Sequence, residues 1–425
     1  MAAKSAPPEP DFTTERHPPP RANPLLLGHE EAEKTLRQAF SSARMHHAWL
    51  IGGVGGIGKA TLAYRFARFA LAATADAAAL EPIRQSVARS PIHHAPPSPS
   101  NGDLFGGGDL FAAAPPPKRP PAPPPPIITQ PPIPTASIDP NSLHLPPEHP
   151  VFRRVRASGH ADLLSIERKF DDKRGRMKTE IAVDDVREIN RFLHHSAAEG
   201  GWRVVVIDGV EQMNASGLNA ILKVLEEPPA RALLLLVTET PGGLLPTIRS
   251  RCRPLLLRPL DEAIVLELLR RYRPDMSSED HITLARLSEG SIGRALNLAN
   301  AGGVALYREI IALISAMPNA DPSALSAFAE QMARKDDEET YETVVDLLEW
   351  WLARLARGAA CNDSPIEITP GEAALVERLR RKHGLERWLE VWEKARHLIN
   401  RADYANLDRK QAVMSALLAV DAALA

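Results

Sequence analysis

Short, unbroken runs of hydrophobic residues alternate with longer segments in which apolar residues recur every three or four positions. The unbroken runs predict buried strands of a parallel sheet, because helices cover both faces of such a sheet. They lie at 48–51, 232–237 and 255–257, and a fourth apolar run, at 202–208, contains Arg203 and ends in Asp208. Helical spacing predicts helices at 30–44, 61–74, 181–193 and 215–225, and mostly helix from Asp261 to Leu424. The pattern therefore predicts a parallel α/β domain followed by all-α domains.

Proline interrupts this pattern twice. Residues 1–22 are rich in proline and charge and are predicted to be a disordered tail, so that globular structure begins near Asn23. Of the 39 prolines, 20 lie between Pro91 and Pro150. Such a segment forms neither helix nor sheet and buries no core. Residues from about 85 to 150 are therefore predicted to be a disordered insertion, with folded sequence resuming near Phe152.

Composition and charge exclude several classes of protein. The net charge is −2, so no global field points to nucleic acid or a membrane surface. The two cysteines, Cys252 and Cys361, lie far apart, which argues against a disulfide framework. The N-terminal sequence lacks the apolar segment of a signal peptide, and no hydrophobic run reaches the ~18–20 residues of a membrane span. A cytoplasmic protein without a membrane partner is expected.

The first strand runs into a glycine-rich segment, Gly53–Thr61 (GVGGIGKAT), and a helix follows. This order is the context of a phosphate-binding loop of the pattern G-x-x-x-x-G-K-[ST]. In such a loop backbone N–H groups cradle phosphates, the lysine reaches the terminal phosphates, and the hydroxyl binds Mg²⁺. The candidate nucleotide-binding residues here are Gly53, Gly55, Gly56, Gly58, Lys59 and Thr61.

One ligand of that pattern is missing, because Ala60 stands where the hydroxyl belongs and a methyl group cannot coordinate a metal. Thr61 is adjacent, but one residue along a helix rotates a side chain by roughly 100°, so it does not simply replace the missing group. The loop therefore predicts a site that holds ATP or an anion without hydrolysis. A plain glycine-rich turn is the alternative.

A second candidate residue, Asp208, ends the hydrophobic run at 202–208 and is expected at the carboxyl edge of the sheet, where ligands gather. In ATPases of this kind such an aspartate holds Mg²⁺ through water, and a glutamate that activates water follows it. Here the next residue is Gly209, and Glu211 lies two positions further on. Asp208 could also be a simple capping residue. Two parts needed for hydrolysis are thus absent from one chain.

Two further motifs complete the pattern: Asn219–Pro229 (NAILKVLEEPP) and Leu244–Cys252 (LLPTIRSRC). The pair resembles the clamp-loader branch of AAA+ proteins, in which L-E-E-P-P and S-R-C are highly specific. With the incomplete glycine loop and Gly209, the sequence is most similar to the delta-prime family of bacterial DNA polymerase III subunits. The resemblance is strong over about residues 23–257, fair over the following helices, and limited to length and helicity beyond them.

The resemblance implies an AAA+ α/β domain over 23–257, a helical lid over 258–304 and a helical collar domain over 305–425. It implies a hetero-pentameric ring with delta and tau or gamma subunits, which loads the sliding clamp on primed DNA during replication. The protein would be a stator of this ring that contributes to the DNA polymerase holoenzyme and is not catalytic alone. Some apolar faces of the C-terminal helices would join subunits in the collar.

In this family the S-R-C motif carries an arginine finger, which corresponds to Arg251. A guanidinium is permanently charged and offers paired donors to a developing phosphoryl charge, so Arg251 could complete a neighbour's site in trans. A solvated surface salt bridge is the alternative. Cys252 is interpreted as a small buried packing residue and not as a nucleophile.

Two positions correspond to the sensors of AAA+ proteins. Arg294, in Gly290–Leu296 (GSIGRAL), corresponds to sensor 2 at the start of a helix, where it could meet a phosphate. The two glycines of that segment could equally serve only to let helices pack. Thr238, after the run at 232–237, corresponds to sensor 1, and a hydroxyl at a strand end is a weak signal by itself.

The proline-rich insertion replaces the cysteine-rich zinc module that many family members carry after the first helix, so no zinc is expected. It contains two G-D-L-F sequences, at 102–105 and 108–111. Their Leu-Phe endings faintly resemble clamp-binding peptides, but the expected leading glutamine is absent and low-complexity drift is the simpler interpretation.

Two other functions compete with the stator. An autonomous ATPase, such as a tau or gamma motor subunit, predicts Ser or Thr after Lys59 and Glu after Asp208, and neither is present. A non-catalytic AAA+ scaffold or DNA-binding protein would have no use for Arg251.

Overall fold

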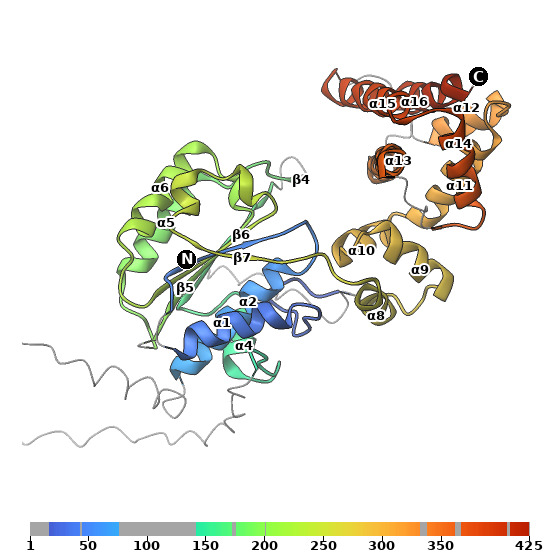
Figure 1. The fold of residues 1–425 in the computed structure, drawn as a ribbon. Coiled ribbons are helices and arrows are strands. Elements are labelled where there is room, and N and C mark those ends of the chain that lie inside the picture. The colour runs from blue at the N-terminus through green and yellow to red at the C-terminus, as the bar shows by residue number, and fades with distance from the viewer. Residues whose placement is uncertain are drawn as a thin grey trace, which may run out of the picture.

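The computed structural model describes residues 17–42, 45–75, 142–171, 176–199, 201–331, 338–361, 367–405 and 409–424. Within these ranges an α/β domain is followed by an all-helical region, as the hydrophobic pattern predicts (Figure 1). The two G-D-L-F sequences and the first sixteen residues lie outside the described residues.

A five-stranded, all-parallel sheet forms the centre of the α/β domain. Its strands, in spatial order, are β2 (Leu163–Ile166), β5 (Arg203–Asp208), β6 (Ala232–Thr238), β1 (Ala48–Gly52) and β7 (Arg253–Leu256). The strands predicted at 48–51, 202–208 and 232–237 are confirmed, and the run at 255–257 overlaps β7, which ends at Leu256. The sequence missed β2, because this short edge strand is only partly buried and lacks an unbroken hydrophobic run.

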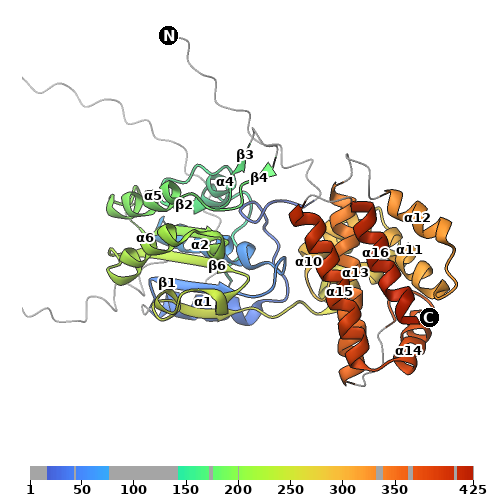
Figure 2. The same ribbon diagram turned by 90° about the horizontal axis from the view of Figure 1, so that it is seen from above.

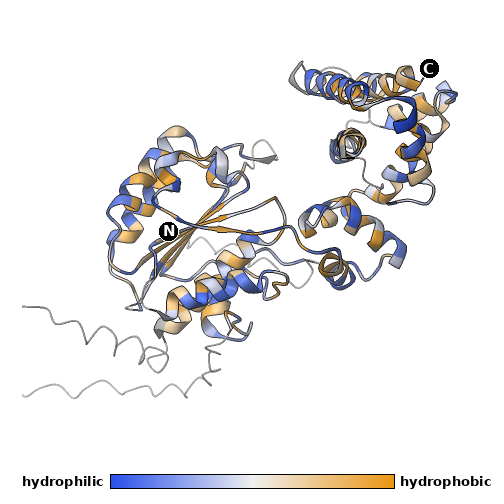
Figure 3. Ribbon diagram, viewed as in Figure 1, coloured by the Kyte–Doolittle hydropathy of each residue, from blue (hydrophilic) through white to orange (hydrophobic). Residues whose placement is uncertain are grey.

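Helices cover both faces of the sheet (Figure 1). On one face lie α1 (Glu30–Ser41), α2 (Lys59–Ala75) and α4 (Pro150–Arg156), and on the other lie α5 (Val183–His194) and α6 (Ala215–Glu226). Side chains of one strand alternate between two hydrophobic cores, so Leu233 and Leu235 join the α2 side while Leu234 and Leu236 join the α6 side. The central strands β1 and β6 are accordingly mostly hydrophobic (Figure 3).

Short elements complete this domain. They are the antiparallel pair β3 (Phe170–Asp171) and β4 (Arg176–Met177), the 3-10 turns η2 (Val210–Gln212) and η3 (Pro241–Gly243), and α7 (Pro246–Arg249).

The helical region begins with the lid, α8 (Glu262–Tyr272), α9 (Ser278–Leu287) and α10 (Ile292–Asn300). The collar region follows, with α11 (Gly303–Ala316), α12 (Pro322–Gln331), α13 (Glu338–Cys361), α14 (Glu372–Lys382), α15 (Leu385–Ala405) and α16 (Arg409–Leu424). Seen from above, these helices lie to one side of the sheet (Figure 2). Among the described helices none alone is long and apolar enough to span a membrane, whereas α10 and α11 pass that test only as a pair bent by 81°.

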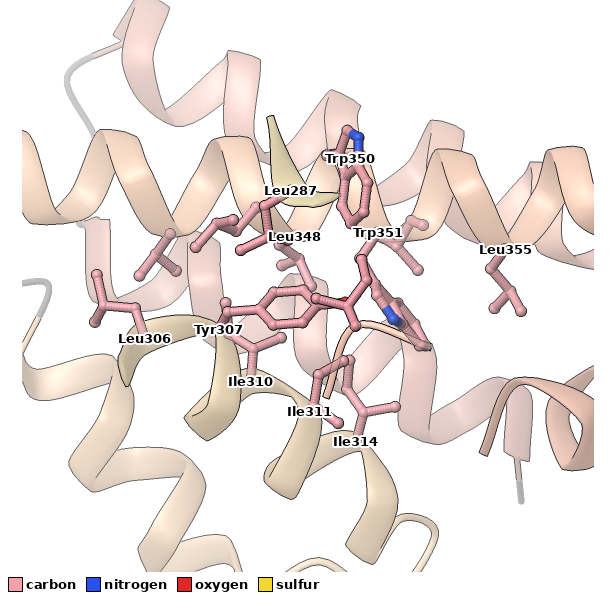
Figure 4. Close-up of a cluster of buried hydrophobic side chains, with 14 of the residues drawn as sticks. Leu287, Leu306, Tyr307, Ile310, Ile311, Ile314, Leu348, Trp350, Trp351 and Leu355 are labelled. Carbon is pink, nitrogen blue, oxygen red and sulfur yellow. The ribbon is translucent and has the colours of Figure 1, made fainter. Parts of the chain in front are cut away.

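One hydrophobic core runs through the lid and the collar region. It includes Leu260 before α8 and Leu424 at the end of α16. Near its middle, Tyr307 of α11 lies beside Trp350 and Trp351 of α13 (Figure 4). The lid is therefore not a separately packed unit.

Folded residues extend beyond two of the predicted boundaries. Ala22, placed in the predicted tail, is buried, because the guanidinium of Arg68 donates to the backbone carbonyls of Arg21 and Asn23 at 2.9 Å each. Leu143, placed in the predicted insertion, belongs to the core on the α2 side. Both segments have a proline-rich composition that predicted disorder. The residues that hold them in place lie elsewhere in the chain, so the local sequence gave no sign of these contacts.

Candidate functional site

The carboxyl ends of three strands meet beside the glycine-rich loop. Gly52 pairs with Thr238, and Asp208 pairs with Val237, so the ends of β1, β5 and β6 lie at one edge of the sheet. A cavity of about 550 Å³ opens there. Its lining includes the predicted residues Gly56, Gly58, Lys59, Thr61, Asp208 and Thr238, together with Ala60.

The other end of this cavity is more apolar. It is formed by the lid residues Leu268, Tyr272 and Leu296, and by the N-terminal residues Leu25 and Leu26. The predicted residues Gly53, Gly55 and Arg294 lie outside its lining. The structure thus brings together most, but not all, of the residues chosen from the sequence.

Lys59 is bonded to its own loop. Its Nζ donates to the backbone carbonyl of Val54 at 2.5 Å, and it lies 4.0 Å from Glu239 Oε1. The side chain is 5% exposed. Burial lowers the pKa of the Lys59 ammonium, while the nearby carboxylates of Glu239 and Asp208 act in the opposite direction. A phosphate would have to compete with the Val54 carbonyl for this ammonium.

Carboxylates outnumber the cation in this part of the cavity. The pKa of Asp208 is raised to about 6, mainly by burial; the carboxylates of Glu167, Glu211 and Glu239 contribute to this rise, and Lys59 opposes it. Glu211 Oε1 accepts a hydrogen bond from the Glu239 backbone N–H at 3.1 Å. Within the described ranges, no group of His, Cys, Asp and Glu side chains is arranged to hold a metal ion.

The sequence did not identify two of these acidic residues. Glu239 comes directly after β6, so the strand-end rule that selected Asp208 could have found it. Glu167 follows β2 in the same way, but β2 itself was missed.

Gly209 has a left-handed backbone with φ of +82°. A Cβ at this position would lie 2.5 Å from Gln212 Oε1. The position where a motor subunit has its glutamate is therefore shaped for glycine in this chain.

The lid docks directly on the glycine loop. Ser291 Oγ donates to the Gly55 carbonyl at 2.8 Å, and the Gly293 N–H donates to the Gly56 carbonyl at 2.9 Å. Gly56 has φ of +72°, and a Cβ there would lie 2.4 Å from Ser291 Oγ. We call this set of contacts, from Gly55 and Gly56 to Ser291 and Gly293, the lid–loop contact.

Arg294 is directed toward the collar region. Its Nη2 lies 2.8 Å from Asp346 Oδ2 on α13, and its guanidinium lies 5.7 Å from the ring centre of Trp350. It lines a second cleft, between the glycine loop and α13, and not the cavity that contains Lys59. Gly293 permits close packing, but against the backbone of Gly56 in the glycine loop and not between two helices as the alternative interpretation had it.

Thr238 is buried at the end of β6, where its Oγ1 accepts a hydrogen bond from the Thr240 N–H at 3.2 Å. Thr61 is also buried, in the first turn of α2. Both hydroxyls lie at the cavity wall, and neither stands at the position of Ala60.

Arg251 lies at the opposite edge of the sheet. Arg253, the first residue of β7, pairs with Trp49, while Leu256, the last, pairs with Gly52 at the glycine loop. Arg251 precedes β7, so strand length alone separates it from that loop by about 10 Å. Its side chain is 36% exposed, with Nη2 at 2.9 Å from Glu226 Oε1. Arg251 therefore faces away from the chain's own cavity.

Cys252, next to it, is buried in the core on the α6 side. Burial raises the pKa of its thiol to about 12, so the sulfur stays protonated and unreactive near neutral pH. This supports its interpretation as a packing residue.

Comparisons with known proteins agree with this architecture. The family model "DNA polymerase III, delta subunit" matches residues 144–261. DNA polymerase III subunit delta' of Pseudomonas aeruginosa is 38% identical over 32% of this chain and 40% of its own length. DNA polymerase III subunit tau of Escherichia coli is 30% identical over 54% of this chain and 36% of its own. The chain thus matches well under half the length of either relative.

A solved gamma-subunit-related protein of DNA polymerase III from Thermotoga maritima aligns with 62% of this chain and 84% of its own. It is 20% identical with a TM-score of 0.27, and it adds nothing to the assignment.

A parallel sheet with a glycine loop at its carboxyl edge, continued by a helical lid and a helical C-terminal region, defines an AAA+ protein. The sequence matches then narrow the class. Over part of its length, the chain is similar to the delta' and tau subunits of DNA polymerase III.

Proposed function

We propose that this protein is the stator of a cytoplasmic clamp loader, a ring that contains delta and tau or gamma subunits and places the sliding clamp on primed DNA. It hydrolyses no ATP itself and supplies Arg251 to the nucleotide of an adjacent tau or gamma subunit. The observation that carries this proposal is the placement of Arg251 and the glycine loop at opposite edges of one sheet. A finger so placed can serve a neighbouring subunit but not its own cavity.

The state of the cavity supports the absence of hydrolysis. Position 60 has no hydroxyl for a metal, and the backbone at Gly209 is shaped for glycine. The lid–loop contact joins the lid directly to the loop by two hydrogen bonds, from Ser291 and Gly293. A stator needs this kind of rigidity, whereas a motor needs a lid that responds to its nucleotide.

A nucleotide fits this cavity in part. The backbone N–H groups of the loop and Lys59 could hold phosphates, and the apolar end near Tyr272 could take a base. The carboxylates of Asp208, Glu211 and Glu239 oppose a phosphate without a counter-cation. We therefore propose at most a passive nucleotide, and no catalytic step depends on it.

The test is the clamp-stimulated ATPase of the reconstituted loader with Arg251→Ala and, separately, Lys59→Ala. Arg251→Ala is expected to cause a large loss, because an arginine finger contributes about 10³-fold or more at its site. Lys59→Ala is expected to leave the rate nearly unchanged, with circular dichroism confirming that the variant is folded. The reverse result would identify an autonomous ATPase. If neither substitution changes the ATPase rate, a scaffold or DNA-binding protein would be favoured.

A further inference from the structure

The two motifs that carry the family resemblance meet at the amino edge of the sheet. Helix α6 leads away from the carboxyl edge and ends at Glu226, within the L-E-E-P-P sequence. Arg251 of the S-R-C sequence lies beside it, with Nη2 at 2.9 Å from Glu226 Oε1. The proposed function uses Arg251 but assigns no role to the first motif.

The guanidinium of Arg251 is held at both of its terminal nitrogens. Nη1 donates to the carbonyl of Thr247 in α7 at 3.0 Å, while Nη2 pairs with Glu226. The backbone is fixed as well, since Ile248 and Cys252 on either side are buried in the core. The side chain nevertheless remains 36% exposed, and a guanidinium has five N–H donors, more than these two contacts use.

We infer that Glu226 is a positioning residue for Arg251, which fixes the plane of the guanidinium before a neighbouring nucleotide arrives. An unrestrained arginine loses rotamer freedom when it engages a phosphate, and a pre-oriented fork loses less. The inference deepens the proposed function and rests on it, because positioning matters only if Arg251 acts on a phosphate.

The nature of the contact makes a specific prediction for substitutions. Positioning needs an acceptor oxygen at residue 226, which an amide supplies as well as a carboxylate. Glu226→Gln should therefore keep most of the restraint on the Arg251 guanidinium, and Glu226→Ala should lose it. Glu227→Ala is the matched control, because Glu227 is an exposed glutamate one residue further along, outside the contact with Arg251.

A first measurement uses the isolated chain and needs no partner. Phenylglyoxal modifies accessible guanidinium groups, and mass spectrometry reports the rate for the peptide that contains Arg251. We expect Glu226→Ala to raise this rate by about two- to fivefold, the range for loss of an exposed ion pair, whereas Glu226→Gln and Glu227→Ala leave it unchanged. An unchanged rate in Glu226→Ala would contradict the inference.

A second measurement uses the reconstituted loader. Glu226→Ala is expected to lower the kcat of the clamp-stimulated ATPase by about two- to fivefold with an unchanged KM for ATP, and Glu226→Gln to restore it. A raised kcat in Glu226→Ala, or equal losses in the Ala and Gln variants, would refute positioning while leaving the finger intact. Arg251→Ala, measured alongside, separates failure of the positioning role from failure of the proposed function. If Arg251→Ala leaves the ATPase rate unchanged, the proposed function itself fails.

Discussion

The two edges of the central sheet differ in what their polar groups contact. At the carboxyl edge the contacts are internal: Lys59 bonds to its own loop, and Ser291 bonds to Gly55. At the amino edge Arg251 is held by Thr247 and Glu226 but keeps an exposed face. The difference teaches that the glycine loop of this chain is joined to the lid, whereas Arg251, the proposed arginine finger, lies at the other end of the sheet and is partly exposed.

The largest expected effect tests the geometry of the amino edge. Arg251→Lys keeps the charge but loses the paired donors, so ATP hydrolysis at the adjacent subunit's site should fall by about 10²-fold or more. Arg249→Lys is the control, because Arg249 is an exposed arginine two positions earlier, at the end of α7. Equal rates in the two variants would mean that charge alone matters at this edge.

The next effect tests the carboxyl edge as a joint. Gly56→Ala should destabilise the chain by about 2–3 kcal/mol, because its Cβ would lie 2.4 Å from Ser291 Oγ in a left-handed backbone. Gly55→Ala should cost less, since its Cβ would meet only the end of the flexible Glu239 side chain, at 2.8 Å. Thermal unfolding compares the two, and equal losses would argue against the lid–loop contact.

A smaller effect depends on pH. The pKa of Asp208 is raised from 3.8 to about 6, so the folded state holds this proton more tightly than the unfolded state. Stability from this group is therefore present below about pH 4 and is lost as the pH rises through about 6. Asp208→Asn should raise the free energy of unfolding by about 1–2 kcal/mol at about pH 8, and by nothing near pH 4. If Asp208→Asn raised the free energy of unfolding equally at all pH values, the raised pKa of Asp208 would be contradicted.

The smallest expected effect is none. Restoring the missing groups with Ala60→Thr and Gly209→Glu together should give no ATPase in the isolated chain. The backbone at 209 is left-handed, and a side chain there would clash with Gln212. Measurable ATP turnover by this variant would show that these two substitutions are sufficient to make the carboxyl edge catalytic.

The sequence predicted elements better than contacts. Unbroken runs located β1, β5 and β6, because burial on both faces leaves a local hydrophobic signal. They gave no sign of β2, an edge strand with a weaker pattern. The cluster at Lys59 and Asp208 was predictable from strand ends, since parallel strands end at one edge.

Contacts between distant segments were out of reach. The pairing of Arg294 with Asp346 depends on how the lid packs on α13, and the bond from Ser291 to Gly55 depends on how the lid meets the loop. Neither leaves a local pattern. The same is true of Arg68, whose guanidinium draws residues 21–23 onto the domain through their carbonyls.

The continuous core of the lid and the collar region has a mechanical consequence. Because Leu260, Tyr307 and Leu424 belong to one hydrophobic cluster, the lid and the collar region share a packed interior, and packed interiors transmit strain. The lid contacts Gly56 through Gly293, while α15 and α16 lie in the collar region. A displacement of these last two helices is therefore expected to shift the contact between the lid and the glycine loop.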